Sequence, residues 1–225
     1  MSNTGTIFIA GASRGVGREI ATILISRGYA VVALVRTADA RIELESLGAQ
    51  VAIGDALNYT DVAQAMTTHS PITAIISTIG GMPVDGQRAD YAGNKHLIDA
   101  AKAAGIPRFL LVSSLGAGAT KDAIPPQAYQ SLAAVLADKE RAEQHLVESG
   151  LTYTIIRPGG LKSAPATGNG VLTIATNVAG SIHRADVATL VCGCLNGTNA
   201  DNLILSAFDR QMTYGEIEYE EFVPS

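Results

Sequence analysis

Three glycines near the amino terminus have the spacing that a diphosphate-binding turn needs. Gly11, Gly15 and Gly17 stand in the run GASRGVG, directly after a short apolar run at residues 6–10. A tight turn from a strand into a helix needs residues without a Cβ atom, and a diphosphate needs backbone N–H groups and a helix N-terminus close to it. The run therefore predicts a dinucleotide site rather than an ordinary turn. The expected binding residues are Gly11, Ala12, Ser13, Arg14, Gly15, Val16 and Gly17.

The end of the next predicted strand, residues 30–35, favours NADPH/NADP+ over NADH. A carboxylate at this place would accept hydrogen bonds from the ribose 2′-hydroxyl and would repel a 2′-phosphate. The chain instead has Arg36 and Thr37, and a guanidinium forms charge-assisted bonds to a phosphate. Arg14 can face the same phosphate, and Arg41 is a weaker third candidate. The alternative is that Arg36 is only a solvated strand end.

Further candidate cofactor contacts follow the later strands. Asp55 fits a contact to adenine, with a turn cap as its structural alternative. Gly80 lets the backbone approach a ribose, and Pro158 would border the nicotinamide. The additional candidates are Asp55, Ala56, Thr78, Ile79, Gly80, Ser113, Lys139 and Pro158.

These residues are placed by a chain that alternates apolar strands with amphipathic helices. Strands are expected at residues 6–10, 30–35, 51–53, 72–77, 108–113 and 152–156. Helices are expected at residues 15–26, 40–47, 61–67 (capped by Thr60), 87–104, 132–149 and 186–195. Strands that are apolar at both odd and even positions are typical of a parallel sheet buried on both faces. The alternation predicts an α/β fold, a Rossmann-type doubly wound parallel sheet with helices on both faces, as a single domain over residues 1–225.

Ligands of such folds bind at the carboxyl end of the sheet. The least regular part of the chain, about residues 159–180, is expected to cover that end and to form the substrate pocket. Residues 82–85 and 117–127 are further candidate walls. His183 and Arg184 precede Asp186, and this group is interpreted as a structural ion pair under the sheet. The other three histidines are expected to have surface or packing roles.

Composition limits the class of protein. The 225 residues are 47% apolar and 16% charged, with a formal net charge of −5. This composition excludes a disordered chain and argues against nucleic acid as a partner. The apolar runs are too short to span a membrane, and the polar first residues do not resemble a signal peptide. Cys192 and Cys194 form an isolated C-x-C pair, so we expect no metal site, two reduced thiols and a cytoplasmic location.

The last residues are acidic. Glu216, Glu218, Glu220 and Glu221 nearly alternate with the apolar residues Ile217, Tyr219 and Phe222. The pattern fits either an edge strand or a solvated tail.

The chain resembles the short-chain dehydrogenase/reductase superfamily. GASRGVG is similar to its cofactor turn. The remaining similarity is to the atypical, NAD(P)H-binding (NmrA-like) branch, and within it to biliverdin IXβ reductase/flavin reductase. The matching segments are GD at 54–55, GNKHLIDAA at 93–101, FLLVSS at 109–114, SGLTYTIIRPG at 149–159 and HRADVA at 183–188.

The catalytic Tyr-x-x-x-Lys motif of that superfamily is missing from its expected place. Tyr91 and Lys95 have the right spacing but precede the fifth strand, whereas the motif belongs on the helix after it. On that helix Lys139 is present, but Val135 stands four residues before it. Ser114, at the end of the fifth strand, matches the active-site Ser and is the expected catalytic residue. A His that some flavin-reductase relatives carry after the sixth strand is replaced by Gly160.

Loss of the tyrosine acid predicts the kind of acceptor. Reduction of an isolated carbonyl needs proton delivery to an alkoxide, whereas a conjugated ring delocalises the charge that a hydride brings. The resemblance therefore implies an NADPH-dependent oxidoreductase acting on a planar aromatic substrate, namely a flavin such as FMN, biliverdin or a quinone. We expect a monomer or weak homodimer. The alternative is a non-catalytic NADP(H)-binding redox sensor or assembly protein, and a less favoured one is an isomerase or epimerase.

Overall fold

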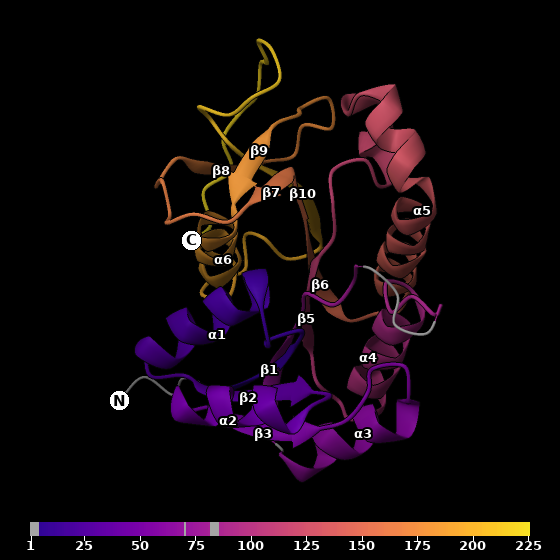
Figure 1. The fold of residues 1–225 in the computed structure, drawn as a ribbon, viewed down its shortest axis with the longest axis vertical. Coiled ribbons are helices and arrows are strands. Elements are labelled where there is room, and N and C mark those ends of the chain that lie inside the picture. The colour runs from indigo at the N-terminus through magenta and orange to yellow at the C-terminus, as the bar shows by residue number, and fades with distance from the viewer. Residues whose placement is uncertain (1–4, 70, 82–85) are drawn as a thin grey trace.

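The computed structural model describes residues 5–69, 71–81 and 86–225, in which helices cover both faces of a mostly parallel sheet (Figure 1). Within these residues the sheet has eight strands, and only the pair formed by the last two in the spatial order is antiparallel. That order is β3 (Gln50–Ile53), β2 (Ala30–Val35), β1 (Thr6–Ala10), β4 (Ile72–Ser77), β5 (Arg108–Val112), β6 (Thr152–Pro158), β10 (Leu203–Asp209) and β8 (Gly170–Thr173). The order reverses between β1 and β4, which confirms the predicted doubly wound fold.

Helices from the two ends of the chain cover one face of the sheet, and helices from its middle cover the other. On one face lie α1 (Gly15–Ser26), α2 (Ala38–Ser46) and α6 (Arg184–Gly193). On the other lie α3 (Tyr59–Thr68), α4 (Ala92–Ala103) and α5 (Pro126–Glu148). A short 3-10 helix, η1 (Gly118–Ala123), precedes α5, and β7 (Gly160–Lys162) pairs with β9 (Ser181–His183) in a small second sheet.

The strand β1 shows how the sheet is buried on both sides. Ile7 and Ile9 pack into the apolar cluster that includes α1, α2 and α6. Phe8 and Ala10 pack into the cluster that includes α3, α4 and α5. Because neighbouring residues of a strand point to opposite faces, such a strand must be apolar at every position. Each large side chain buried in this way contributes about 1.5–3 kcal/mol, and the two layers hold the connecting loops at fixed places.

The predicted elements at 6–10, 15–26, 30–35 and 72–77 coincide with β1, α1, β2 and β4. Two predicted helices have wrong starts, because the helix expected at 87–104 begins at Ala92 and the one expected at 132–149 begins at Pro126. The first turns of α5 are mostly exposed and have no apolar period, so the pattern contains no sign of them. The remaining predicted ends lie within two residues of the observed ones.

The amino-terminal cap of α3 also differs from the prediction. Asn58, and not Thr60, is the capping residue, and its Oδ1 accepts a hydrogen bond from the Thr60 backbone N–H at 3.0 Å. Asn at this position satisfies one of the free N–H groups at the start of a helix.

The sequence pattern missed the strands β7, β8, β9 and β10. Three of them have only three or four residues, too few to show a period. The fourth, β10, is longer and pairs in parallel with β6, so it extends the main sheet beyond the predicted six strands. The irregular region at 159–180 therefore contains β7 and β8.

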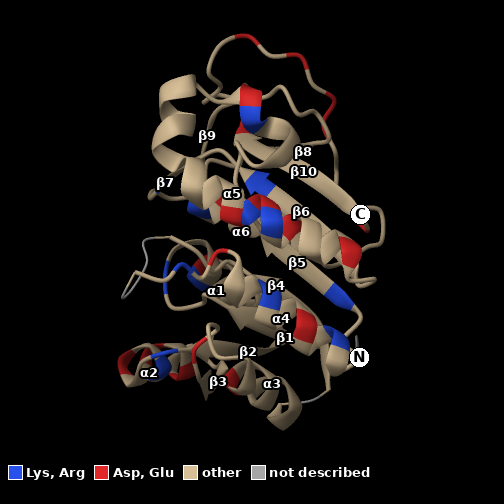
Figure 2. Ribbon diagram, turned by 90° about the vertical axis from the view of Figure 1, so that its right-hand side faces the viewer, with Lys and Arg blue, Asp and Glu red and all other residues tan. Residues whose placement is uncertain are grey.

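The acidic tail is not an edge strand. It is extended, and its one bridge to the main sheet is a bond from the Phe222 N–H to the Leu172 carbonyl at 2.7 Å. Tyr219 packs edge-on against Phe208, with ring centres 4.9 Å apart, while the glutamates are exposed. The prediction of a solvated tail is right for the acids and wrong for the apolar residues between them. Figure 2 shows the acidic segments in the loop at the top of the molecule.

Both cysteines are buried and form no disulfide, as predicted. Burial raises the pKa of Cys192 and of Cys194 to about 12, so both are neutral thiols under ordinary conditions. Over the described residues, no group of three or more His, Cys, Asp or Glu side chains could hold a metal ion. Those residues also contain no helix that is long and apolar enough to cross a membrane.

A buried ion pair connects β6 to α5. Glu143 accepts two hydrogen bonds from Arg157, at 3.0 Å from Nε and 2.6 Å from Nη2. The two side chains are 4% and 6% exposed. The bidentate geometry compensates both charges, and the pair fixes α5 relative to the end of β6.

We expect Glu143→Ala to destabilise the fold by about 3–5 kcal/mol, because Arg157 is left with an uncompensated buried charge. The exposed Glu140, on the same helix, provides the matched control, and Glu140→Ala should change the free energy of unfolding by less than about 0.5 kcal/mol. Urea unfolding followed by circular dichroism measures both. Equal effects of the two substitutions would show that the buried pair contributes no more than a surface charge.

Candidate active site

A cavity of about 720 Å³ opens at the carboxyl ends of the central strands. It lies where the strand order reverses between β1 and β4, which is the place where doubly wound sheets bind ligands. Of the predicted site residues, its wall contains Gly11, Ser13, Arg14, Gly15, Val16, Arg36, Asp55, Ala56, Thr78, Ile79, Gly80, Ser113, Ser114, Lys139 and Pro158.

The glycine turn brings α1 directly against the end of β1. Gly11 and Gly15 have φ angles of +93° and +58°, which favour glycine. A Cβ atom on Gly17 would lie 2.2 Å from the Gly11 carbonyl oxygen. Gly17 therefore permits close packing and does not line the cavity, and Ala12 is fully buried beside it. Ala12 and Gly17, both predicted as cofactor contacts, therefore support the turn through packing and do not line the cavity.

Two arginines lie in the wall, Arg36 directly after β2 and Arg14 in the glycine turn. Among the described residues, neither Arg14 nor Arg36 has an ion-pair partner, so both guanidiniums are available to a ligand. Arg41 points elsewhere, because its Nε contacts Glu45 at 2.7 Å, and it does not line the cavity. Thr37 is not in the wall either. Its hydroxyl caps α2 by accepting the Ala40 N–H at 3.4 Å.

Asp55 has a structural role as well as a place in the wall. Its Oδ1 accepts the Leu57 N–H, and its own N–H donates to Asp61 Oδ2, both at 2.9 Å. The turn is held further by His96, whose Nδ1 lies 2.9 Å from the Ala56 carbonyl. The carboxylate thus lies at a fixed place in the wall, and the contact to adenine stays a prediction.

Sequence reasoning missed the partner of Lys139. Asp90, which is fully buried, lies 3.2 Å from the Lys139 ammonium. Gly80 makes room for this pair, since a Cβ there would be 2.4 Å from Asp90 Oδ1 and 3.1 Å from Lys139 Nζ. Asn94 donates to the Asp90 carbonyl at 2.7 Å and accepts from Ser77. Asp90 is an isolated acid in a loop, so no motif could have indicated it.

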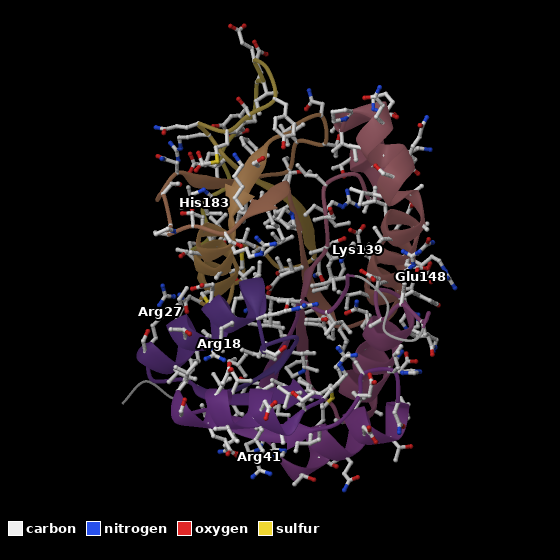
Figure 3. The ribbon with its side chains drawn as sticks, in the orientation of Figure 1. Arg18, Arg27, Arg41, Lys139, Glu148 and His183 are labelled. Carbon is white, nitrogen blue, oxygen red and sulfur yellow. The ribbon has the colours of Figure 1, made fainter. Side chains whose placement is uncertain are left out.

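Figure 3 labels Lys139 on the side of α5 that faces the strands. Because Asp90 neutralises part of its charge, Lys139 can hold neutral hydroxyl groups as well as anions.

The two serines after β5 differ in their free hydrogen-bonding groups. Ser114 Oγ already donates to the Leu115 carbonyl at 2.9 Å, which leaves only its lone pairs for a ligand. Ser113 Oγ is buried and has no partner among the described residues. A buried hydroxyl without a partner is costly, so this atom fits a ligand amide or carbonyl in the cavity.

The literal Tyr-x-x-x-Lys match lies away from the cavity, as the sequence indicated. The Tyr91 ring lies under the Arg141 guanidinium at 3.8 Å, and Lys95 pairs with Asp99. Neither lines the cavity.

The prediction for the HRADVA segment is wrong. Asp186 forms no pair with Arg184, because it accepts the N–H groups of Thr167 and Gly168, both at 2.9 Å. Arg184 lies instead in the cavity wall and donates to the Leu161 carbonyl. The sequence alone does not indicate whether the side chain of Arg184 points toward Asp186, two residues later, or toward the cavity.

The expected substrate-pocket segments contribute little to this wall. From the region 159–180 only Gly159 and Leu161 line it, and no residue of 117–127 does. The predicted wall at 82–85 lies outside the described residues. Gln87 and Ala89, which the sequence did not single out, complete that side.

The residues present fit a phosphorylated dinucleotide. The positive-φ glycines form a cradle at the start of α1, and the guanidiniums of Arg14 and Arg36 lie in the wall without an ion-pair partner among the described residues. The Ser113 hydroxyl, which has no partner among those residues, lies after β5. These are the groups that a diphosphate, a 2′-phosphate and a carboxamide need.

Comparisons with known proteins agree with this geometry. The model of a family described as NAD(P)H-binding matches residues 11–198. The solved structure of ChuY, described as an anaerobillin reductase from Escherichia coli O157:H7, is 32% identical with a TM-score of 0.85, covering 95% of this chain and 100% of that one. YhfK of Bacillus subtilis (strain 168), described as an uncharacterized sugar epimerase, is 31% identical over 220 residues, which are 96% of this chain and 97% of YhfK. Protein TIC 62, chloroplastic, of Oryza sativa subsp. japonica is 30% identical over 210 residues, 82% of this chain and 42% of TIC 62.

We expect Arg36→Ala to weaken NADPH binding about ten- to a hundredfold, because a charge-assisted contact to a phosphate is lost. Binding of NADH, which has no 2′-phosphate, should change little. Arg41→Ala is the matched control, since this arginine is close in sequence, pairs with Glu45 and lies outside the cavity. Isothermal titration calorimetry measures both cofactors, and equal losses for NADPH and NADH would contradict the 2′-phosphate assignment.

Proposed function

Because the chain belongs to the NAD(P)H-binding family, we propose that it is an NADPH-dependent reductase that transfers hydride to a planar conjugated acceptor. The acceptor classes are a flavin such as FMN, a tetrapyrrole such as biliverdin, or a quinone.

The observation that carries the proposal is the absence of tyrosine from the cavity wall, as far as the described residues go. Hydride addition to an isolated carbonyl needs an acid for the alkoxide, which the superfamily's tyrosine would supply. In a conjugated ring the added charge spreads over many atoms, and solvent can deliver the proton. A wall with serines, a paired lysine and no phenol favours the second kind of acceptor.

The wall residues bind and orient in this proposal. Arg14 and Arg36 hold the 2′-phosphate, and Lys139, positioned by Asp90, holds ribose hydroxyls. Ser113 accepts or donates a hydrogen bond at the carboxamide and so fixes which face of the nicotinamide meets the acceptor. When bound, NADPH supplies the hydride.

Pro158 and Gly159 limit the other side of the acceptor space, and Ser114 offers lone pairs to an acceptor N–H. Ser114 is thus the proposed catalytic residue because it would contact the acceptor.

The similarity to ChuY supports a tetrapyrrole acceptor, since that protein is described as an anaerobillin reductase and the two chains align over nearly their whole lengths. A cytoplasmic location is supported by the two buried, unpaired thiols. The chloroplastic relative leaves a plastid as the alternative. A monomer or weak homodimer is proposed for the quaternary state.

A second function, an NADP(H)-binding sensor or assembly protein without turnover, is favoured by the exposed glutamates of the tail, which could meet a basic partner. The similarity to TIC 62 is compatible with it. Deletion of residues 216–225 would not isolate the effect of the glutamates on partner binding, because it would also remove Tyr219 and Phe222, which pack on β10 and β8. Replacement of the four glutamates by glutamine leaves that packing in place.

We expect the purified protein to oxidise NADPH when FMN, biliverdin or menadione is added, with one acceptor reduced per NADPH consumed. Loss of reduced-nicotinamide absorbance and acceptor spectra measure both sides of this balance. Lys139→Ala should lower turnover, and Lys95→Ala, on the neighbouring helix and outside the cavity, should not. Tight NADPH binding without turnover of any of these acceptors would refute the reductase and favour the second function.

A further inference from the structure

One cation of the cavity wall is not used by the proposed function. Arg184 is the first residue of α6, and this helix packs directly against α1 (Figure 1). The preceding residue, His183, is labelled in Figure 3 and marks where α6 begins. Arg184 therefore reaches the cavity from the carboxyl-terminal half of the chain, whereas the glycine turn comes from the amino-terminal half.

The Arg184 side chain lies beside Gly15 of the glycine turn. A Cβ atom built on Gly15 would be 3.6 Å from both Cδ and Nε of Arg184, which is ordinary van der Waals contact. Gly15 is the second glycine of the turn and begins α1, so its N–H is among those that face a diphosphate. The guanidinium and the helix N-terminus thus lie on the same small region of the cavity.

Most of the donors of this guanidinium are free. Nη1 donates to the Leu161 carbonyl at 3.3 Å and to Ser163 Oγ at 2.8 Å. These are neutral groups, and among the described residues Arg184 has no carboxylate partner. An arginine has five N–H donors, so Nε and Nη2 keep three that can face a ligand. The two bonds hold the side chain over the turn and leave its charge uncompensated.

The other cations of the wall already have assignments. Lys139 is paired with Asp90, and the proposed function assigns Arg14 and Arg36, which line the cavity, to the 2′-phosphate. NADPH carries negative charge at two places, on the 2′-phosphate and on the diphosphate. The second of these has no cationic side chain in the predicted site.

We propose that Arg184 is the diphosphate-binding cation of this site, because its side chain lies beside Gly15 at the start of α1. This inference rests on the proposed function, because it needs a dinucleotide in the cavity. The diphosphate is common to NADH and NADPH, so Arg184 sets how tightly either cofactor binds, and Arg36 sets the choice between them.

The test compares Arg184→Gln and Arg184→Ala with the wild type by calorimetry. The glutamine variant keeps a donor for Leu161 and removes the charge. The probes are NADPH, NADH and adenosine 2′-monophosphate, which lacks the diphosphate. We expect both dinucleotides to lose affinity by the same factor, about tenfold or more, and the monophosphate to bind as before.

Lys162→Gln is the matched control, because this exposed cation lies nearby on β7 and outside the wall, and it should change no affinity. The proposal is overturned if the Arg184 variants bind both dinucleotides like the wild type, if they lose NADPH alone, or if only the KM for the acceptor rises. Failure of the wild type to bind any dinucleotide would overturn the proposed function itself, so the two failures are distinguishable.

Discussion

The contact on which the site depends is the one between the Gly17 α-carbon and the Gly11 carbonyl. Because no side chain separates them, the first turn of α1 lies directly on the end of β1. Thr78, which follows the neighbouring strand β4, donates a hydrogen bond from its hydroxyl to the same carbonyl at 3.2 Å. That packing points the free N–H groups of α1 into the cavity at the place where the sheet reverses its order. The neighbouring loops are built around this geometry.

Charge in the cavity is divided between groups that are compensated and groups that are not. Lys139 in the wall is paired with Asp90, and the Glu143–Arg157 pair, which lies outside the wall, balances its own charges; both pairs position α5. The guanidiniums at the phosphate-facing side have no carboxylate among the described residues. A protein with a net charge of −5 thus keeps a locally basic cavity, which attracts a polyanionic cofactor that the rest of the surface repels.

The sequence is sufficient for features that depend on neighbours along the chain. β1, α1, β2 and β4 follow from apolar periods and from the glycine turn, and the wall residues that follow each strand were found because parallel strands end at one edge. The sequence does not indicate that Asp90 pairs with Lys139 or that Arg184 lies in the wall, because both features depend on contacts between distant segments. The short strands after β6 were missed because they are too short for a period and exist through pairing.

Lys139 and Glu143 are four residues apart and so share one face of α5. On that face the helix contributes a cation to the loop before α4 and an anion to β6, each at a buried contact. A sliding movement of α5 along its axis would separate both pairs at once, and a rotation would expose both to the apolar layer. The two contacts therefore fix both the axial position and the rotation of α5, and with them the place of Lys139 in the cavity wall.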